Sequence, residues 1–219
     1  MVVTIDGPAG AGKSSVARGL ARRLGFRFLD TGATYRAVAL AGLERNVAWD
    51  DAAALTRLAR ALQIDIRGEQ VLLDGRDVTR EIRTSQVTAR IHHVADNPQI
   101  RQLLVDLQRR LADGGHVVTE GRDQGTVVFP SAECKVFLTA SPEERALRRM
   151  RDLKARGEAL PFSQVLQQQN ERDCRDSTRE VGRLVAAPDA IELNTDGLTP
   201  EEVIDRLEVM VRARWPGET

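Results

Sequence analysis

Near its start the chain carries a glycine-rich stretch, GPAGAGKS, whose residue types and spacing suit the binding of phosphate groups. It meets the pattern G-x-x-x-x-G-K-[ST] in full, with Gly7, Gly12, Lys13 and Ser14. Glycines let the backbone turn its N–H groups inward around an anion, because no Cβ blocks a positive φ or a close approach. Lys13 would reach the outer phosphates, and the Ser14 hydroxyl would ligate Mg²⁺. The stretch predicts a site for a nucleoside triphosphate; the alternative is a glycine-rich turn without a ligand.

The segments on either side of this stretch are those that would position it. The apolar run Val2 to Ile5 comes before it, and Val16, Leu20 and Leu24 follow at helical spacing. A strand, a glycine loop and a helix are therefore predicted, with the positive end of the helix dipole directed at the bound anion. Lys13 is one of only three lysines among 32 basic residues. A compact ammonium and a planar guanidinium are not interchangeable at phosphates, which favours a specific role for Lys13.

Further charged and aromatic residues follow other predicted strands. Tyr35 and Arg36 lie just after the strand FRFLD, and Arg122 and Asp123 lie just after the strand that begins at His116. The carboxyl ends of parallel strands form the edge at which open α/β sheets hold ligands. A ligand site at this edge is predicted. For Tyr35 and Arg36 the alternative is an aromatic core contact beside a surface arginine.

Two arginine-rich helical segments complete the set. Arg145 and Arg149 share a face of the helix in SPEERALRRM, and RDCRDSTR places more arginines around Asp176. Catalysis of phosphoryl transfer depends on positioning and on stabilising the negative charge of the transferred group, which arginines supply. Asp123 and Asp176 could orient these arginines or accept hydrogen bonds from a ligand; local ion pairing is the alternative. The candidate catalytic residues are Lys13, Arg36, Arg122, Arg145, Arg149 and Arg175.

The order of the elements predicts the fold. Strands near Val2, Arg27, Val117, Val136 and Ile191 are separated by helices, which indicates an α/β fold with a P-loop and a doubly wound, five-stranded parallel sheet covered by helices on both faces. A hairpin over Ile64 to Asp74 interrupts this alternation and indicates an insertion. We expect residues 1–219 to form a single domain that contains it.

Composition limits the partners. There are 32 residues of each charge, so the net charge is zero and no overall field attracts nucleic acid or an anionic membrane. No apolar run is long enough to span a membrane and no signal peptide begins the sequence, so a cytoplasmic location is expected. Cys134 and Cys174 have no metal-binding or disulfide spacing. A monomer without nucleic-acid or membrane partners is expected.

Several motifs together resemble those of the bacterial cytidylate kinases over nearly the whole chain. They are GPAGAGKSS, DTGATYRAVAL, EIRT, EGRDQGTVVFP, SPEERALRRM and RDCRDSTRE. The resemblance implies transfer of phosphate from ATP to CMP or dCMP with Mg²⁺. It also implies a nucleoside monophosphate (NMP)-binding region over about residues 31–95 and a mobile helical lid over about 145–175.

The resemblance also implies roles for individual residues. Arg36 and Arg122 would contact the acceptor phosphate, Arg101 and Asp123 the cytosine, and Arg172 and Asp176 the sugar. Thr31, Tyr35 and Arg179 would complete the acceptor pocket, while Arg145 and Arg149 would close over the transferred group. The residues implied to bind ATP are Gly7, Pro8, Ala9, Gly10, Ala11, Gly12, Lys13, Ser14 and Ser15.

The chain departs from the family pattern at four positions. His92 stands where the family usually places a small serine that helps to read the base, so that contact is in doubt. Thr34 and Gln124 replace apolar residues within two motifs, and Asn194 replaces an aspartate. We expect these last three changes to be peripheral to the chemistry.

Two other functions share part of the pattern. A small-molecule kinase similar to shikimate kinase would share the loop, the sheet and a lid, but the hairpin and RDCRDSTRE argue against it. A GTP-binding switch would share only the loop and would need an N-K-x-D motif, which the sequence lacks.

Overall fold

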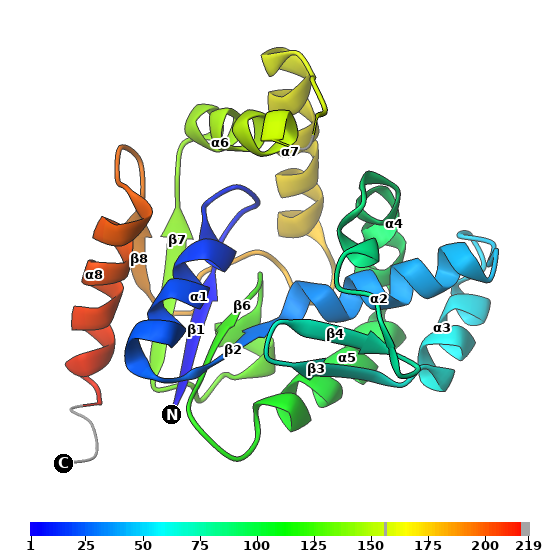
Figure 1. Ribbon diagram of the computed structural model, residues 1–219, viewed down its shortest axis with the longest axis horizontal. Helices are drawn as coiled ribbons and strands as arrows, with labels where there is room; N and C mark the ends of the chain where they lie inside the picture. The colour runs from blue at the N-terminus through cyan, green and yellow to red at the C-terminus, as the bar shows by residue number, and fades with distance from the viewer. Residues whose placement is uncertain (156, 216–219) are drawn as a thin grey trace. The chain divides into compact units, whose positions relative to one another are not determined.

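The structure is a computed structural model, and it describes residues 1–155 and 157–215 (Figure 1). The chain forms two compact units. The first contains Met1–Phe28 and the chain from His116 onward, and the second contains Leu29–Gly115. Each unit has its own hydrophobic core.

The predicted five-stranded sheet is present. Its strands are β1 (Val2–Asp6), β2 (Arg27–Asp30), β6 (Val117–Glu120), β7 (Cys134–Thr139) and β8 (Ile191–Asn194), in the order β2-β6-β1-β7-β8. The pairs β1–β6, β1–β7 and β7–β8 are parallel. In this register Ile5 lies beside Glu120, so the segments that follow β1 and β6 leave the sheet at the same edge.

The two faces of β1 have different neighbours, because side chains alternate along a strand. Val3 and Ile5 are fully buried in a core that includes residues of α1 (Lys13–Leu24) and α8 (Pro200–Arg212). Thr4 and Asp6 point to the opposite face, where they lie against the π-helix η2 (Gln124–Val128). The sheet of the first unit is therefore covered on both faces.

Two helices beyond the sheet correspond to the expected arginine-rich pair. They are α6 (Pro142–Ala155) and α7 (Phe162–Thr178), which lie past the carboxyl end of β7 (Figure 1). They share a small apolar cluster built on Ala146, Leu153 and Val165. Ser141 lies before α6, and its hydroxyl accepts a hydrogen bond from the Glu144 N–H.

The second unit consists of helices packed on a small antiparallel sheet. Its helices are α2 (Thr31–Glu44), α3 (Ala52–Ala61), α4 (Ser85–Ala95) and α5 (Pro98–Ala112), with the short 3₁₀ helix η1 (Glu81–Arg83). The predicted hairpin is present as β3 (Ile64–Arg67) and β4 (Gln70–Leu73), and β5 (Arg76–Asp77) adds a third strand.

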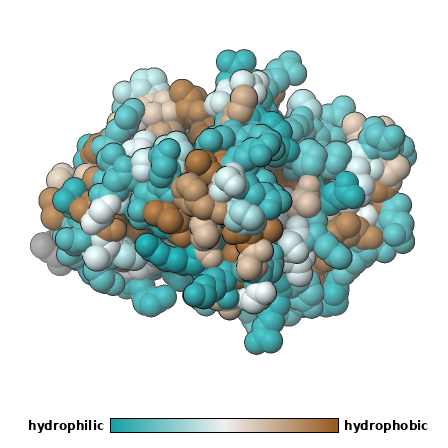
Figure 2. Space-filling model, turned by 90° about the horizontal axis from the view of Figure 1, so that it is seen from above, coloured by the Kyte–Doolittle hydropathy of each residue, from teal (hydrophilic) through white to brown (hydrophobic). Residues whose placement is uncertain are grey.

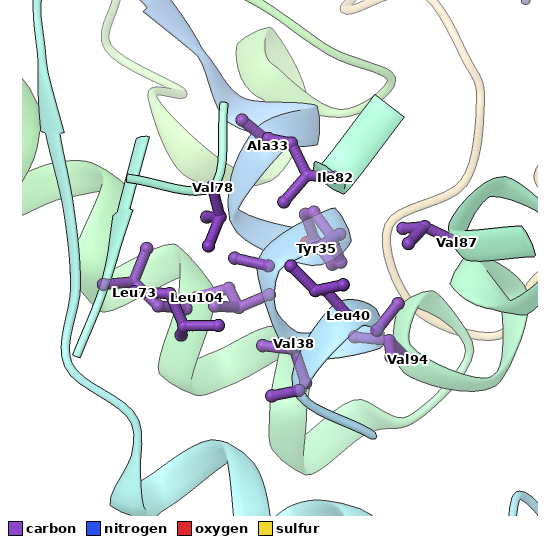
Figure 3. Packing of buried hydrophobic residues seen from close by; sticks show 14 of the residues in the cluster. Ala33, Tyr35, Val38, Leu40, Leu73, Val78, Ile82, Val87, Val94 and Leu104 are labelled. Carbon is purple, nitrogen blue, oxygen red and sulfur yellow. The ribbon is translucent and has the colours of Figure 1, made fainter. Parts of the chain in front are cut away.

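Helix α2 is the centre of the second core. Ten of its residues are buried, among them Ala33, Tyr35, Val38 and Leu40, and they pack against residues of η1, α4 and α5 (Figure 3). The helix begins at Thr31, directly after β2. The cap is Asp30, whose carboxylate accepts a hydrogen bond from the Ala33 N–H at 3.0 Å. The last residue of β2 therefore also starts the helix.

Two of the departures from the family pattern are buried and hydrogen-bonded. The Thr34 hydroxyl donates to the carbonyl of Thr31 and accepts from the Gln108 amide at 3.0 Å. Gln124 is 1% exposed, and its side-chain carbonyl accepts from the Thr119 hydroxyl. Each polar replacement thus has a polar partner, as burial requires.

Hydrophilic side chains cover most of the face shown in Figure 2. Within the described ranges, the structure contains no helix both long enough and apolar enough to cross a membrane.

Truncating Ile82 should destabilise the second core. Ile82 is fully buried and comes from η1, so Ile82→Ala should lower the free energy of unfolding by roughly 2 to 5 kcal/mol through lost burial and an unfilled cavity. Val209 is 70% exposed, and Val209→Ala should change it by no more than about 0.5 kcal/mol. Urea unfolding of both variants measures the difference, and equal effects would contradict this packing.

Candidate active site

Three glycines give the loop from Gly7 to Gly12 a backbone conformation that other residues rarely adopt. Gly7, Gly10 and Gly12 have φ values of +145°, +81° and +87°. A Cβ on Gly7 would lie 2.1 Å from the carbonyl oxygen of Leu138, so only glycine allows this approach to β7. Helix α1 begins at Lys13 without a side-chain cap. Its first N–H groups are therefore left for an anion, which fits a bound triphosphate.

Lys13 is a buried cation at this loop. It is 5% exposed, and its ammonium donates to the carbonyl of Pro8 at 2.8 Å. Burial, followed by the positive charge of Arg122, lowers the pKa of Lys13 to about 7, although Glu120 opposes the shift. An anion brought to this place would relieve the cost of holding that charge out of water.

Ser14 and Glu120 supply adjacent oxygen ligands. The Ser14 hydroxyl donates to the Glu120 carboxylate at 2.7 Å, which joins the start of α1 to the carboxyl end of β6. A hydroxyl and a carboxylate side by side beside a phosphate loop form the oxygen-donor set that Mg²⁺ prefers. These residues fit the ion that the loop motif implies.

Helices α6 and α7 are bonded directly to the phosphate loop. The Arg145 guanidinium donates to the carbonyls of Ala9 and Ala140 and pairs with Asp173. Gln169 donates to the same Ala9 carbonyl at 3.2 Å. In this arrangement Arg145 holds the loop through its backbone, so any contact with a transferred phosphate would require these bonds to be exchanged.

Three arginines surround one buried carboxylate in the first unit. Asp176 accepts hydrogen bonds from Arg122 at 3.0 Å and Arg179 at 2.7 Å, and Arg172 lies 3.9 Å away. Burial acts to raise the pKa of Asp176, but these three arginines outweigh it and lower the pKa below the usual range. The cluster thus gathers three guanidinium groups around one buried carboxylate. Four of the predicted acceptor residues are therefore brought together.

Two other predicted arginines lie outside this cluster. Arg175 is exposed and donates only weakly, at 3.4 Å, to the carbonyl of Glu171. Arg149 is half-buried on α6. The catalytic roles expected for Arg145, Arg149 and Arg175 remain predictions.

Asp6 and Asp123 lie next to the same site. Asp6 is 5% exposed, and its carboxylate accepts the N–H groups of Gln124 at 2.9 Å and Gly125 at 2.7 Å. Burial raises the pKa of Asp6 to about 6, despite these two hydrogen bonds. Asp123 is 3% exposed and lies at the start of η2. Sequence reasoning selected Asp123 but missed Asp6, because its hydrogen-bond partners are 118 and 119 residues away.

The second unit contains its own pair of arginines on a buried carboxylate. Asp30 pairs with Arg83 at 2.8 Å and with Arg36, whose Nη1 lies at 3.5 Å. That Nη1 atom is buried and makes no hydrogen bond among the described residues, so it is suited to a ligand oxygen. Arg36 was predicted and Arg83 was not, although the motif EIRT that contains it was recognised.

Tyr35, Arg101 and Thr31 are all buried. Tyr35 lies in the hydrophobic cluster of Figure 3, and the Arg101 guanidinium lies 5.5 Å from its ring centre. Arg101 also donates to the carbonyl of Ala95 at 3.0 Å. Tyr35 is thus part of the core, as the alternative interpretation allowed. Its expected contact with the acceptor remains a prediction, as do those of Arg101 and Thr31.

His92 lies on the last turn of α4 and is half-buried. Its ring centre is 4.0 Å from that of His93, whose ring in turn lies 5.4 Å from Trp49. The residue in the serine position therefore takes part in an aromatic stack.

A phosphate loop after the first strand of a parallel sheet, overlaid by arginine-bearing helices, defines a P-loop kinase. The sequence profile described as cytidylate kinase matches residues 3–213. The chain is 53% identical to a cytidylate kinase of Rhodopirellula baltica, covering 97% of this chain and 93% of that one. It is 49% identical to a cytidylate kinase of Mycobacterium avium, covering 98% and 96%. The chain belongs to the cytidylate kinase family, and it is an ATP-dependent nucleoside monophosphate kinase.

Solved structures share the fold at low sequence identity. The crystal structure of TT1252 from Thermus thermophilus has a TM-score of 0.51 at 22% identity, covering 99% of this chain and 98% of that one. A gluconokinase from Sinorhizobium meliloti has a TM-score of 0.50 at 17% identity, covering 97% and 93%. These likenesses support the P-loop kinase fold.

Gly7→Ala should abolish ATP binding. The new Cβ would overlap the Leu138 carbonyl and add roughly 1 to 3 kcal/mol of backbone strain, so the loop must move. Gly25→Ala is the matched control: Gly25 also has a positive φ, +71°, but nothing lies within 4 Å of an added Cβ. It should cost about 1 to 2 kcal/mol of stability and leave ATP affinity unchanged. Calorimetric titration with ATP distinguishes them, and normal binding by Gly7→Ala would contradict the close approach.

The Asp6 carboxyl should make stability depend on pH. Its pKa rises from 3.8 in the unfolded chain to about 6 in the fold, so the folded state binds more protons between these values. The resulting stabilisation is present below about pH 4 and is lost as pH rises through about 6. Relative to Asp6→Asn, the wild type should gain up to about 3 kcal/mol on going from pH 7.5 to pH 4. Urea unfolding across this range measures the gain, and a constant difference would contradict it.

Proposed function

We propose that the chain transfers the γ-phosphoryl group of ATP to CMP or dCMP, giving CDP or dCDP and ADP. The observation that carries the proposal is the gathering of three arginines, Arg122, Arg172 and Arg179, around Asp176. Arg122 and Arg172, which pair with that carboxylate, also lower the pKa of Lys13 at the phosphate loop. A second phosphate group beside the donor is what such a cluster would accommodate.

The donor side is formed by the loop and the start of α1. The uncapped N–H groups at the start of α1 and the Lys13 ammonium would bind the phosphates of ATP, and Ser14 with Glu120 would hold Mg²⁺. When bound, Mg²⁺ neutralises charge on the phosphate oxygens. The bonds from Arg145 and Gln169 to Ala9 keep the loop in shape, and the helices that carry them would limit access of water to the transferred group.

The residues of the acceptor side are those that the family motifs imply. Arg36 and Arg122 would bind the phosphate of CMP, and Arg101 and Asp123 would bind the cytosine. Asp176 and Arg172 would contact the sugar, with Thr31, Tyr35 and Arg179 completing the pocket. The Asp176 carboxylate prevents Arg122 from swinging freely, because Nε is bonded at 3.0 Å while Nη1 donates to the Gly121 carbonyl. Orienting the guanidinium in advance lowers the entropy lost when the phosphate binds.

Other features of the proposal rest on the sequence. We expect a monomer in the cytoplasm, and this is tested by sedimentation and by fractionation of the source cells. The GTP-switch alternative lacks its N-K-x-D motif.

A panel of acceptors tests the proposed substrate. Purified protein with Mg-ATP should phosphorylate CMP and dCMP in preference to UMP, AMP and shikimate, with ADP release and phosphorylated product measured together. Preference for another acceptor would overturn the assignment. Tight binding of GTP without transfer would favour the switch instead.

Arg122→Ala should reduce turnover strongly and leave ATP affinity nearly unchanged. The variant removes a charged donor from the acceptor phosphate, for which a loss of roughly 10² to 10³ in kcat is typical. Arg212→Ala is the control, because Arg212 pairs with Glu208 on the surface of α8. Steady-state kinetics and ATP titration give the two values, and an unchanged kcat would remove Arg122 from the mechanism.

A further inference from the structure

The π-helix η2 is capped from a distant strand. Its first residue follows Asp123, which occupies the N-cap position but makes no side-chain cap hydrogen bond. The N–H groups of Gln124 and Gly125 are instead bonded to the carboxylate of Asp6, at 2.9 Å and 2.7 Å. Asp6 ends β1, directly before the phosphate loop.

This arrangement is unusual in chemical terms, since aspartate is among the best N-cap residues and normally binds the free N–H groups of its own helix. Asp123 has the right type and position for that task. Asp6 carries it out instead, and two carboxylates are therefore buried close together, which costs free energy because each charge opposes ionisation of the other. A fold that only needed to cap η2 would not require the second carboxylate.

We propose that Asp6 is a positioning residue for acceptor recognition: by capping η2, it keeps the Asp123 carboxylate from turning onto its own helix and directs it to the nucleobase. The inference rests on the proposed function, in which Asp123 binds cytosine. Through these hydrogen bonds, Asp6 joins the end of β1 to the segment that follows Arg122 and Asp123.

The Asp6 carboxylate is surrounded by the backbone at the start of η2. Gly125 brings its backbone against β1, and a Cβ there would lie 3.0 Å from the Thr4 hydroxyl and 3.4 Å from Asp6 Oδ2. The Thr119 hydroxyl holds the Gln124 side chain at 3.0 Å. The start of η2 is thus fixed against β1 and β6, and the Asp6 carboxylate is enclosed by the backbone it binds.

Asp6→Asn tests the proposal, because it keeps the shape and removes one of the two acceptor oxygens. We expect KM for CMP to rise about tenfold, with a smaller change in kcat, and the preference for CMP over UMP to fall by a similar factor. A loss of stability alone would lower activity with both acceptors and leave their ratio unchanged. Asp51→Asn is the matched control, since Asp51 caps α3 through the Ala54 N–H and should leave the ratio unaltered.

The double variant Asp6→Asn/Asp123→Asn gives a second, independent measurement. If Asp6 acts through Asp123, Asp6→Asn should add little to the loss of CMP preference already caused by Asp123→Asn. Additive losses would overturn the proposal, as would an unchanged CMP to UMP ratio in Asp6→Asn. A wild type that does not phosphorylate CMP would instead overturn the proposed function.

Hydrogen exchange on the wild type keeps the proposal testable if Asp6→Asn does not fold. The amides of Gln124 and Gly125 should be protected both without nucleotide and with CMP bound. Rapid exchange of these amides in either state would show that Asp6 does not hold the helix and would overturn the proposal.

Discussion

The site depends on charged side chains that the fold buries close to one another. Lys13 is buried at the start of α1, and burial together with Arg122 makes its ammonium easier to deprotonate. Close by, three arginines surround Asp176 and lower its pKa despite its burial. Holding such charges in a partly desolvated place costs free energy, which bound phosphate groups would offset. The site is therefore arranged for anionic ligands, and its stability should depend on them.

The strand β1 connects the parts that must be held around these charges. Its inward residues Val3 and Ile5 join the core under α1, and its opposite face receives the π-helix through Asp6. At its end, the loop approaches β7 so closely that Gly7 admits no side chain. Hence a single strand fixes the phosphate loop, the helix dipole and the segment with Arg122 relative to one another, all within the first unit.

Features that depend on local sequence could be predicted. The phosphate loop, the order of the strands along the chain and the hairpin each follow from residues a few positions apart. The motifs also selected the arginines that gather on Asp176. Asp30 ends the predicted strand FRFLD, but its capping of α2 was not predicted.

The remaining features depend on contacts between distant residues, which no local pattern records. Arg83 donates a hydrogen bond to Asp30, which lies 53 residues earlier in the sequence. Arg145 donates one to the carbonyl of Ala9, 136 residues earlier. The same geometry changed the interpretation of Arg145, from a residue expected over the transferred group to one that holds the phosphate loop in this arrangement. The sequence position of Tyr35 is compatible with either a ligand contact or a place in the core. Only the packing of α2 shows that it lies in the core.

The most direct test of the account is calorimetric titration with a bisubstrate analogue in which adenosine and cytidine are joined through five phosphates. The account predicts one molecule bound per chain, with an affinity at least about tenfold higher than for the analogue that carries two adenosines. Equal affinity for the two analogues would contradict the claim that the basic cluster belongs to a site for a cytidine nucleotide.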